Sequence, residues 1–278
     1  MNLSISNLAW DIADDEKIAG LLRARGIDSI DLVPGKYFPS PISTTDDSIF
    51  NVRKQWEARG IEIIGMQSLL FGTKGLNIFG VPAIQDEMLL HLAAICRIAA
   101  GLTCKYLVFG SPRNRDRSGL SDPEAADTAI HFFRRLADIA DAYGVVVCLE
   151  PNPTCYGANF MTTSKETALI VNAVDHPAIR MQFDTGAIAL NNECPRTVLQ
   201  ECANIIGHIH ASEPQLVPLG YGTTDHAEMA NAIGQYLPES IVSIEMLPPP
   251  EEAGPDTIEH VLDFAIRTYR DHRETVTT

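Results

Sequence analysis

The sequence predicts a single-domain α/β protein, a (β/α)₈ TIM barrel that spans residues 1–278. Three observations support this prediction. Eight short aliphatic or β-branched segments alternate with helix-like segments along the whole chain. The first of them is followed by Trp10-Asp11-Ile12 rather than by the glycine-rich turn that is typical of an open doubly wound sheet. The length of 278 residues also suits one such barrel.

The expected strands are short apolar runs, each followed by a helix-like pattern. They cover residues 3–9, 29–33, 61–69, 106–110, 145–150, 179–184, 205–211 and 241–246. Helix starts are expected at Ser121, which is followed by Pro123 and Glu124, and at Thr163. A last helix is expected after the segment Gly254-Pro255-Asp256. Parallel strands with helical crossovers of this kind close into a barrel.

Composition and charge exclude several classes of protein. Hydrophobic residues make up 45% of the chain and charged residues 21%, as in ordinary globular proteins. A net charge of -15 argues against a surface that binds nucleic acid. The sequence contains neither a long apolar run for a membrane span nor a signal peptide pattern at its start. Six cysteines without C-x-x-C spacing indicate reduced thiols, so we expect a cytoplasmic protein.

Four potential metal ligands lie at one repeated position, the C-terminal end of an expected strand. They are Glu150, Asp184, His210 and Glu245. Strand C-termini gather around one mouth of a barrel, where active sites are built. Taken singly, each residue also fits a loop cap or a buried polar group, but four on consecutive strands favour one site. Three carboxylates and an imidazole favour Mn²⁺, with Mg²⁺ or Co²⁺ as alternatives, over a zinc site of thiolates.

Strand alternation places a second set of side chains below these ligands. The residues two positions before each ligand are Cys148, Gln182, His208 and Ser243. Barrel interiors are usually filled with bulky apolar side chains, so a polar layer there is unusual. We expect either that these residues orient the ligands or that they form a hydrogen-bonded polar core.

The ligand segments resemble those of the xylose isomerase-like barrel superfamily, the sugar phosphate isomerase/epimerase group. Its members include ketohexose 3-epimerases, inosose dehydratase and hydroxypyruvate isomerase. The resemblance spans nearly the whole chain and is most specific in the Leu-Glu-Pro of 149–151, the Phe-Asp-Thr-Gly of 183–186 and the His-Ile-His-Ala-Ser-Glu-Pro of 208–214. It implies that Glu150, Asp184, His210 and Glu245 bind one divalent metal.

The same resemblance implies a reaction. Glu150 and Glu245 would flank a substrate carbon and move its proton, which makes them the catalytic pair. The expected activity is isomerisation or epimerisation of a small sugar, sugar phosphate or cyclitol through an enediolate intermediate. Metal stabilisation of the enediolate and proton transfer by two carboxylates are the physical basis of that chemistry.

The chain departs from the ketohexose 3-epimerases at three places. The histidine that they usually carry three residues after the aspartate is replaced by Ala187. Their arginine after the His-x-x-Glu segment is replaced by Gln215, Leu216 or Val217. Their Asn-Arg-x-Glu stretch is replaced by residues 152–157. These departures argue against a simple ketohexose as the substrate.

Several residues near strand ends are candidates for substrate binding. The main candidates are Glu213, Trp10, Tyr156, Asn159 and Arg113, and Asn7 and Gln67 also lie near strand ends. Glu213 fits either a hydrogen bond to a substrate hydroxyl or a solvated loop acid. Arg113 belongs to a basic segment with Arg115 and Arg117, which fits either a phosphate or carboxylate site or a solvated loop. Trp10 fits packing as well as recognition.

Three other functions are alternatives to the isomerase on the same fold. A dehydratase is the nearest, because it also begins by removing a proton beside a carbonyl. A nuclease like endonuclease IV needs additional ligands, one of which would stand at Ala187, and a less acidic surface. A barrel that only binds a metabolite is the third. The expected partners are a small carbohydrate-like substrate and a second copy of the chain in a homodimer, with neither nucleic acid nor membrane.

Overall fold

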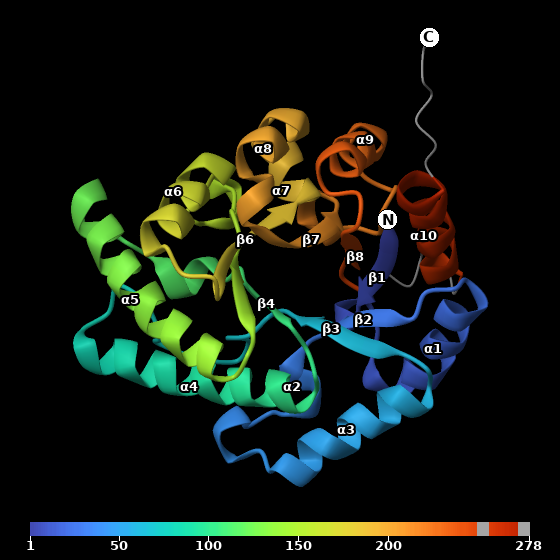
Figure 1. Ribbon diagram of the computed structural model, residues 1–278, viewed down its shortest axis with the longest axis horizontal. Coiled ribbons are helices and arrows are strands. Elements are labelled where there is room, and N and C mark those ends of the chain that lie inside the picture. The colour runs from blue at the N-terminus through green and yellow to red at the C-terminus, as the bar shows by residue number, and fades with distance from the viewer. Residues whose placement is uncertain (249–255, 272–278) are drawn as a thin grey trace.

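A computed structural model describes residues 1–248 and 256–271 of the chain as a closed barrel of eight parallel strands. The strands follow one another around the barrel in sequence order, and β8 pairs with β1 to close it. Helices lie around the outside of the strands (Figure 1). This architecture confirms the predicted (β/α)₈ barrel. That all 278 residues form one domain stays a prediction.

The strands have these bounds: β1 (Asn2–Ser6), β2 (Ser29–Leu32), β3 (Glu62–Met66), β4 (Tyr106–Phe109), β5 (Val146–Leu149), β6 (Ile179–Asp184), β7 (Ile206–Ser212) and β8 (Ile241–Glu245). The helices are α1 (Asp15–Ala24), α2 (Pro34–Tyr37), α3 (Asp46–Ala58), α4 (Pro82–Gly101), α5 (Asp122–Ala142), α6 (Ser164–Val174), α7 (Thr185–Leu190), α8 (Pro195–Cys202), α9 (His226–Tyr236) and α10 (Thr257–Ala265). The last helix, expected after residues 254–256, begins at Thr257 as predicted, while Gly254 and Pro255 lie outside the described residues.

Local sequence signals explain where the best predicted helices begin and end. At the start of α5, the Glu124 carboxylate accepts hydrogen bonds from the Ser121 backbone N–H (2.9 Å) and hydroxyl (2.6 Å). After the helix, Gly144 adopts a φ of +69°, which favours glycine and lets the chain turn directly into β5. At the start of α6, the Thr163 hydroxyl accepts from the Glu166 backbone N–H at 3.1 Å.

The strands β1 and β3 each end three residues before their predicted ends. After β1 the chain forms a 3-10 turn over Asn7–Ala9, and the Ser6 hydroxyl accepts from the Leu8 backbone N–H at 3.1 Å. After β3, Ser68 adopts a φ of +56°, which ends the extended conformation although apolar residues continue. Hydrophobicity therefore predicted these strands but not the turns that end them.

The two faces of the strands differ in polarity. Alternating residues such as Leu3 and Ile5 belong to the hydrophobic core with the outer helices. The residues that alternate with them on the same strand, Ser4 and Ser6, are polar and fully buried. Alternation therefore directs Ser4 and Ser6 toward the barrel axis. The interior of this barrel thus contains polar side chains instead of being filled by bulky aliphatic ones.

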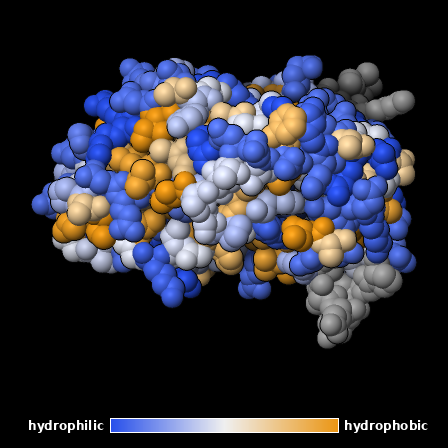
Figure 2. Space-filling model, turned by 90° about the horizontal axis from the view of Figure 1, so that it is seen from below, coloured by the Kyte–Doolittle hydropathy of each residue, from blue (hydrophilic) through white to orange (hydrophobic). Residues whose placement is uncertain are grey.

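One face of the molecule is mostly hydrophilic. Figure 2 shows a face on which hydrophilic residues predominate, with hydrophobic residues gathered toward the end where α4 and α5 lie. In the described parts of the chain, none of the helices combines the length and apolar character needed to cross a bilayer. The predictions of a cytoplasmic location and a homodimer stay predictions from the sequence.

Candidate metal centre

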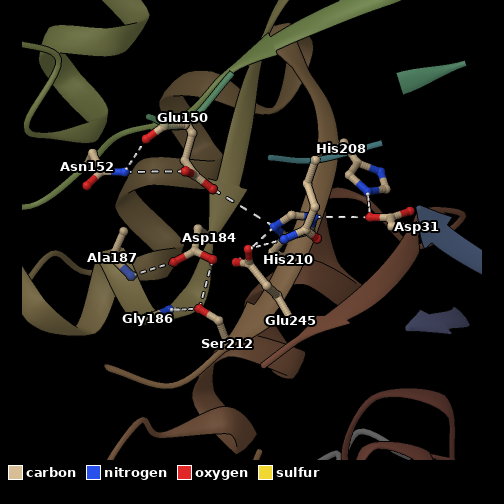
Figure 3. Close-up of polar contacts among 12 residues, drawn as sticks. Asp31, Glu150, Asn152, Asp184, Gly186, Ala187, His208, His210, Ser212 and Glu245 are labelled. Atoms are coloured by element: carbon tan, nitrogen blue, oxygen red, sulfur yellow. Dashed lines mark hydrogen bonds and ion pairs between the residues drawn. The ribbon is translucent and has the colours of Figure 1, made fainter. Parts of the chain in front are cut away.

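Four side chains from four consecutive strands converge at one end of the barrel. Glu150 directly follows β5, Asp184 ends β6, His210 lies in β7 and Glu245 ends β8. Each offers one ligand atom, and these four atoms lie within 4.8 Å of one another. Figure 3 shows the three carboxylates and the imidazole pointing toward a shared point. The structure therefore brings together all four residues that the sequence predicted as metal ligands.

His210 presents one ring nitrogen to the carboxylates and the other to the barrel interior. Its Nδ1 lies 3.2 Å from Glu245 Oε2 and 3.9 Å from Glu150 Oε1. Its Nε2 lies 3.1 Å from Asp31 Oδ2, on β2. The imidazole is completely buried, so its orientation is set by these contacts.

Asp184 is held by groups at the start of α7 and the end of β7. Its Oδ1 accepts from the Ala187 backbone N–H at 2.6 Å, and its Oδ2 accepts from the Ser212 hydroxyl at 2.8 Å. The same hydroxyl accepts from the Gly186 backbone N–H at 3.1 Å. Asp184 thus caps α7, and the backbone of Ala187, where relatives usually carry a histidine, contributes to the site through its N–H.

Glu150 occupies space that glycine leaves open on the neighbouring strand end. A Cβ atom at Gly110 would overlap the Glu150 carboxylate. The Asn152 amide donates to Gly110 O at 2.7 Å and approaches Glu150 Oε2 at 3.4 Å. The buried Arg115 guanidinium donates to Glu150 O at 2.7 Å and to Gly110 O at 3.2 Å. These contacts fix both the backbone and the carboxylate of Glu150.

Glu245 is held from the opposite side of the mouth. The Gln67 amide, just after β3, donates to Glu245 Oε1 at 2.5 Å. Glu245 Oε2 faces His210. One oxygen of Glu245 is therefore fixed by Gln67 while the other remains directed at the shared point of the four ligands.

The electrostatics of the cluster favour a bound cation. Burial, and then the neighbouring carboxylates of Glu245 and Asp184, raise the pKa of Glu150 to about 8. Burial and Glu245 likewise raise the pKa of Asp184 to about 6. Burial opposes protonation of His210, but Glu245 and Asp31 outweigh it and raise its pKa well above the ordinary value. A divalent cation would replace these protons and relieve the repulsion, so the donor set fits such an ion.

An open cavity lies over the four ligands. One part, of about 1020 Å³, is lined by the β3–α4 and β4–α5 loops together with Glu150, Tyr156 and Glu245. A second part, of about 300 Å³, is lined by the same three residues and by Asp184. Because Glu150 and Glu245 line both parts, a molecule in either part has access to these carboxylates.

Three of the main substrate-binding candidates, Tyr156, Arg113 and Glu213, line this cavity, and Gln67 lines it as well. Tyr156 is 40% exposed, and its hydroxyl accepts from the Gln215 backbone N–H at 2.7 Å. Arg113 is exposed on the β4–α5 loop and has no ion pair or hydrogen bond among the described residues. The rest of the basic segment is not a solvated loop: Arg115 is fully buried, and Arg117 pairs with Asp122.

Two other predicted residues lie outside the lining of the cavity. Trp10 is 3% exposed, and its indole N–H donates to Asp15 Oδ1 at 2.9 Å. Asn159 is exposed but binds the neighbouring loop, where it donates to Asp116 Oδ1 at 2.7 Å and accepts from the Arg117 backbone. These positions favour packing for Trp10 and loop attachment for Asn159.

Glu213 has protein partners for its carboxylate. It accepts from the backbone N–H groups of Gly220 (3.1 Å) and Thr224 (3.0 Å) and pairs with His226 Nε2 at 3.1 Å. Burial opposes its ionisation, but these bonds, led by that to His226, hold its pKa at about 2. Glu213 is 1% exposed. These contacts hold the loop before α9, and Glu213 also lines the smaller part of the cavity, so its bond with a substrate hydroxyl stays a prediction.

The four polar residues below the ligands behave differently from one another. All four are buried. His208 Nε2–H donates to Asp31 Oδ2 at 2.7 Å, and the same oxygen accepts from His210 Nε2–H at 3.1 Å. Cys148 packs against Gly207, and Ser243 has no hydrogen-bond partner for its hydroxyl among the described residues. The Gln182 amide, oriented so that both of its polar atoms have partners, donates to His208 O and accepts from the His210 backbone N–H, each at 3.2 Å. The side chains of His208 and Gln182 are therefore the two of these four that are linked to a ligand by hydrogen bonds.

Sequence reasoning did not find two buried residues that support the site. Asp31 stands alone as an acid within the aliphatic segment 29–33, and that isolation is the signal that could have identified it. Arg115 resembled its basic neighbours in sequence, and nothing local distinguished it as buried.

Known proteins resemble this chain in both fold and sequence. One similar solved structure is a D-psicose 3-epimerase from Clostridium cellulolyticum H10, with 17% identity, a TM-score of 0.81 and coverage of 98% of this chain and 99% of that chain. An L-ribulose 3-epimerase has 16% identity, a TM-score of 0.79 and coverage of 100% of this chain and 99% of that chain. A 3-keto-D-glucoside 4-epimerase from E. coli has 16% identity, a TM-score of 0.77 and coverage of 98% of this chain and 100% of that chain. At these identities the likeness concerns the fold alone. The sequence model of the family described as "Xylose isomerase-like TIM barrel" matches residues 20–266. The chain therefore belongs to the xylose isomerase-like TIM barrel family.

Proposed function

We propose that this chain is a metal-dependent isomerase or epimerase of a small carbohydrate. The observation that supports this most directly is the convergence of Glu150, Asp184, His210 and Glu245 at the floor of an open cavity. Membership of the xylose isomerase-like family supports an enzyme, and the similar structures named above are sugar epimerases.

Asp184, His210, Glu150 and Glu245 would hold one divalent cation. The donor set of three carboxylates and one imidazole favours Mn²⁺, with Mg²⁺ or Co²⁺ as alternatives. When bound, the cation would supply positive charge beside the substrate carbonyl and so stabilise the negative charge that develops there. Each carboxylate oxygen of Asp184 accepts one hydrogen bond, from Ala187 or Ser212, and keeps a lone pair, which suits an oriented ligand rather than a proton carrier.

Glu150 and Glu245 would move the proton. One carboxylate removes the hydrogen next to the carbonyl, and the other returns a proton from the opposite side. Return to the same carbon inverts it, and return to the neighbouring carbon isomerises the sugar. Gln67 and Asn152 hold the two carboxylates in place during this exchange. A raised pKa, such as the value of about 8 for Glu150, suits a group that alternates between acid and base.

The test is exchange of solvent deuterium into a panel of ketoses, inososes and their phosphates with added Mn²⁺. We expect Glu150→Gln and Glu245→Gln each to lower exchange by at least about a thousandfold while the circular dichroism spectrum is unchanged. Glu87→Gln, on the exposed side of α4, is the matched control and should exchange normally. Exchange that persists in either site variant removes that glutamate from proton transfer, and a product lighter by one water identifies a dehydratase.

A further inference from the structure

Asp31 is an acid buried inside the barrel, below the four proposed ligands. It lies on β2, far in sequence from β7, and no part of it is exposed to solvent. One of its oxygens, Oδ2, lies 2.7 Å from His208 Nε2 and 3.1 Å from His210 Nε2. Figure 3 shows Asp31 on the side of His210 that faces away from the three carboxylates. A single carboxylate oxygen therefore joins both histidines.

This contact determines which nitrogen of His210 is free to bind a metal. An ionised carboxylate only accepts hydrogen bonds, so the Nε2 atoms of both rings must carry their hydrogens. A neutral imidazole with hydrogen on Nε2 has its lone pair on Nδ1. Nδ1 of His210 is the atom that faces Glu245 and Glu150.

We propose that Asp31 is a positioning residue that holds His210 in the tautomer and orientation that bind the metal through Nδ1. His208 takes part by holding the same Asp31 oxygen from a second direction. The inference rests on the metal site of the proposed function and adds to it a residue that is not itself one of the four ligands. Carboxylates that orient a ligating histidine commonly change metal affinity by about 10- to 100-fold when they are removed.

The neighbouring strand supports this assignment independently. Gly65 on β3 is the register partner of Asp31, and a Cβ atom at Gly65 would overlap the Asp31 carboxylate. The register between β2 and β3 shifts between Ile30 and Asp31. The backbone of β3 is thus shaped to admit this side chain, and any larger residue at position 65 would displace it.

His208 is itself held in place, which keeps Asp31 from turning away. Its ring stacks on Tyr106 with centroids 5.4 Å apart and an interplanar angle of 15°. It meets the ring of His210 edge to face, with centroids 5.3 Å apart. A chain of successive contacts therefore runs from the barrel interior to the ligand site, through the side chains of Tyr106, His208, Asp31 and His210.

Four variants distinguish a role of Asp31 in positioning His210 from a role in stabilising the fold as a whole. Asp31→Leu removes the acceptor and keeps the branching of the side chain, and Asp31→Asn keeps the shape but weakens the acceptor, because its amide carries no charge. Gly65→Ala leaves the carboxylate in the protein but displaces it. Ser4→Ala is the matched control, because Ser4 is equally buried on a neighbouring strand and its hydroxyl has no hydrogen-bond partner among the described residues.

The first measurement is Mn²⁺ affinity by calorimetric titration, without substrate. We expect Asp31→Leu to weaken binding by about 10- to 100-fold and Asp31→Asn by less. Gly65→Ala should resemble Asp31→Leu, and combining the two should add little, since both remove one contact. Ser4→Ala should bind within about twofold of the wild type.

The second measurement is the tautomer of His210, read from ¹⁵N NMR of the protein loaded with diamagnetic Mg²⁺. The wild-type protein should show hydrogen on Nε2 and the metal on Nδ1, and this pattern should be lost or mixed in Asp31→Leu. If Asp31→Leu does not fold, Asp31→Asn and Gly65→Ala provide the same comparison.

Three outcomes overturn the inference. They are unchanged affinity with an unchanged tautomer in the Asp31 variants, wild-type His210 with hydrogen on Nδ1, and a loss in Ser4→Ala as large as that in Asp31→Leu. If the wild-type protein binds no divalent metal, the proposed metal site fails as well. If the wild type binds metal but exchanges no substrate proton, the proposed reaction fails while the role of Asp31 stands.

Discussion

Removing divalent metal should make the stability of this protein fall as the pH rises from about 5 to 8. In the metal-free protein the pKa of Glu150 is raised from 4.5 to about 8, and that of Asp184 from 3.8 to about 6. A group whose pKa is higher in the folded protein binds protons more tightly when folded. Its stabilising contribution is therefore complete at low pH and is lost as the pH rises through the folded pKa. The raised pKa of His210 acts in the same direction.

The magnitude follows from the size of the shift. A change from 4.5 to about 8 corresponds to about 5 kcal/mol at about 1.4 kcal/mol per pKa unit. Glu150 and Asp184 repel the same neighbour, Glu245, so their contributions are not summed. We expect a loss of ~3–5 kcal/mol, which lowers the melting temperature by roughly 5–10 °C in a chain of this length.

The assay is thermal unfolding in chelator across this pH range, repeated with saturating Mn²⁺. Bound metal should remove most of the slope, because it takes the place of the protons. Glu150→Gln should flatten the slope without metal, while Glu87→Gln, on the exposed side of α4, should not. Below pH about 4.5, Glu213 acts oppositely, since its pKa is lowered to about 2 and its stabilisation is lost on acidification. Metal-free stability that is flat or rising between pH 5 and 8 would refute the reasoning.

Three further changes test individual residues. Gly110→Ala should weaken Mn²⁺ binding by more than about tenfold in a titration, because the new Cβ occupies the place of the Glu150 carboxylate; affinity equal to wild type would contradict this. Glu213→Leu should lower the unfolding free energy by about 3–5 kcal/mol in a urea melt, because it leaves His226 buried without its partner, and a loss below about 1 kcal/mol would speak against a loop-holding role. Arg113→Gln should leave the melting temperature unchanged and raise KM only for phosphorylated or acidic sugars; equal effects on neutral and anionic sugars would remove it from recognition.

The fold and the ligand set were predictable because both depend on regular features. Alternating apolar strands and capped helices are local patterns, and each strand end has a fixed place in a closed barrel. Glu150, Asp184 and Glu245 could therefore be placed at one mouth without any knowledge of loops. The loop residues could not be placed in this way, because their conformations depend on individual contacts.

Glu213 illustrates the limit of spacing arguments. Its position three residues after His210 puts it at the mouth of the barrel, as the sequence predicted. Which way its carboxylate turns depends on Gly220, Thr224 and His226, which lie up to 13 residues later in a loop that folds back. Gln215 and Leu216 adopt positive φ values in that loop, which no apolar pattern predicts.

Two of the acidic residues in this barrel, Asp31 and Glu150, lie against a glycine on the adjacent strand or strand end, and the reason is steric. Interior side chains of a closed barrel meet their neighbours around the whole circumference, so a carboxylate that points inward needs space from an adjacent strand. Gly65 provides that space for Asp31, and Gly110 provides it for Glu150. A glycine interrupting an apolar strand is thus informative about its neighbour in space, since it marks where another side chain closely approaches the backbone. An isolated acid in one strand together with a glycine in the next, as in Asp31 and Gly65, is a pattern that a sequence alone can show, and in this protein it identifies a residue that spacing from the metal ligands did not.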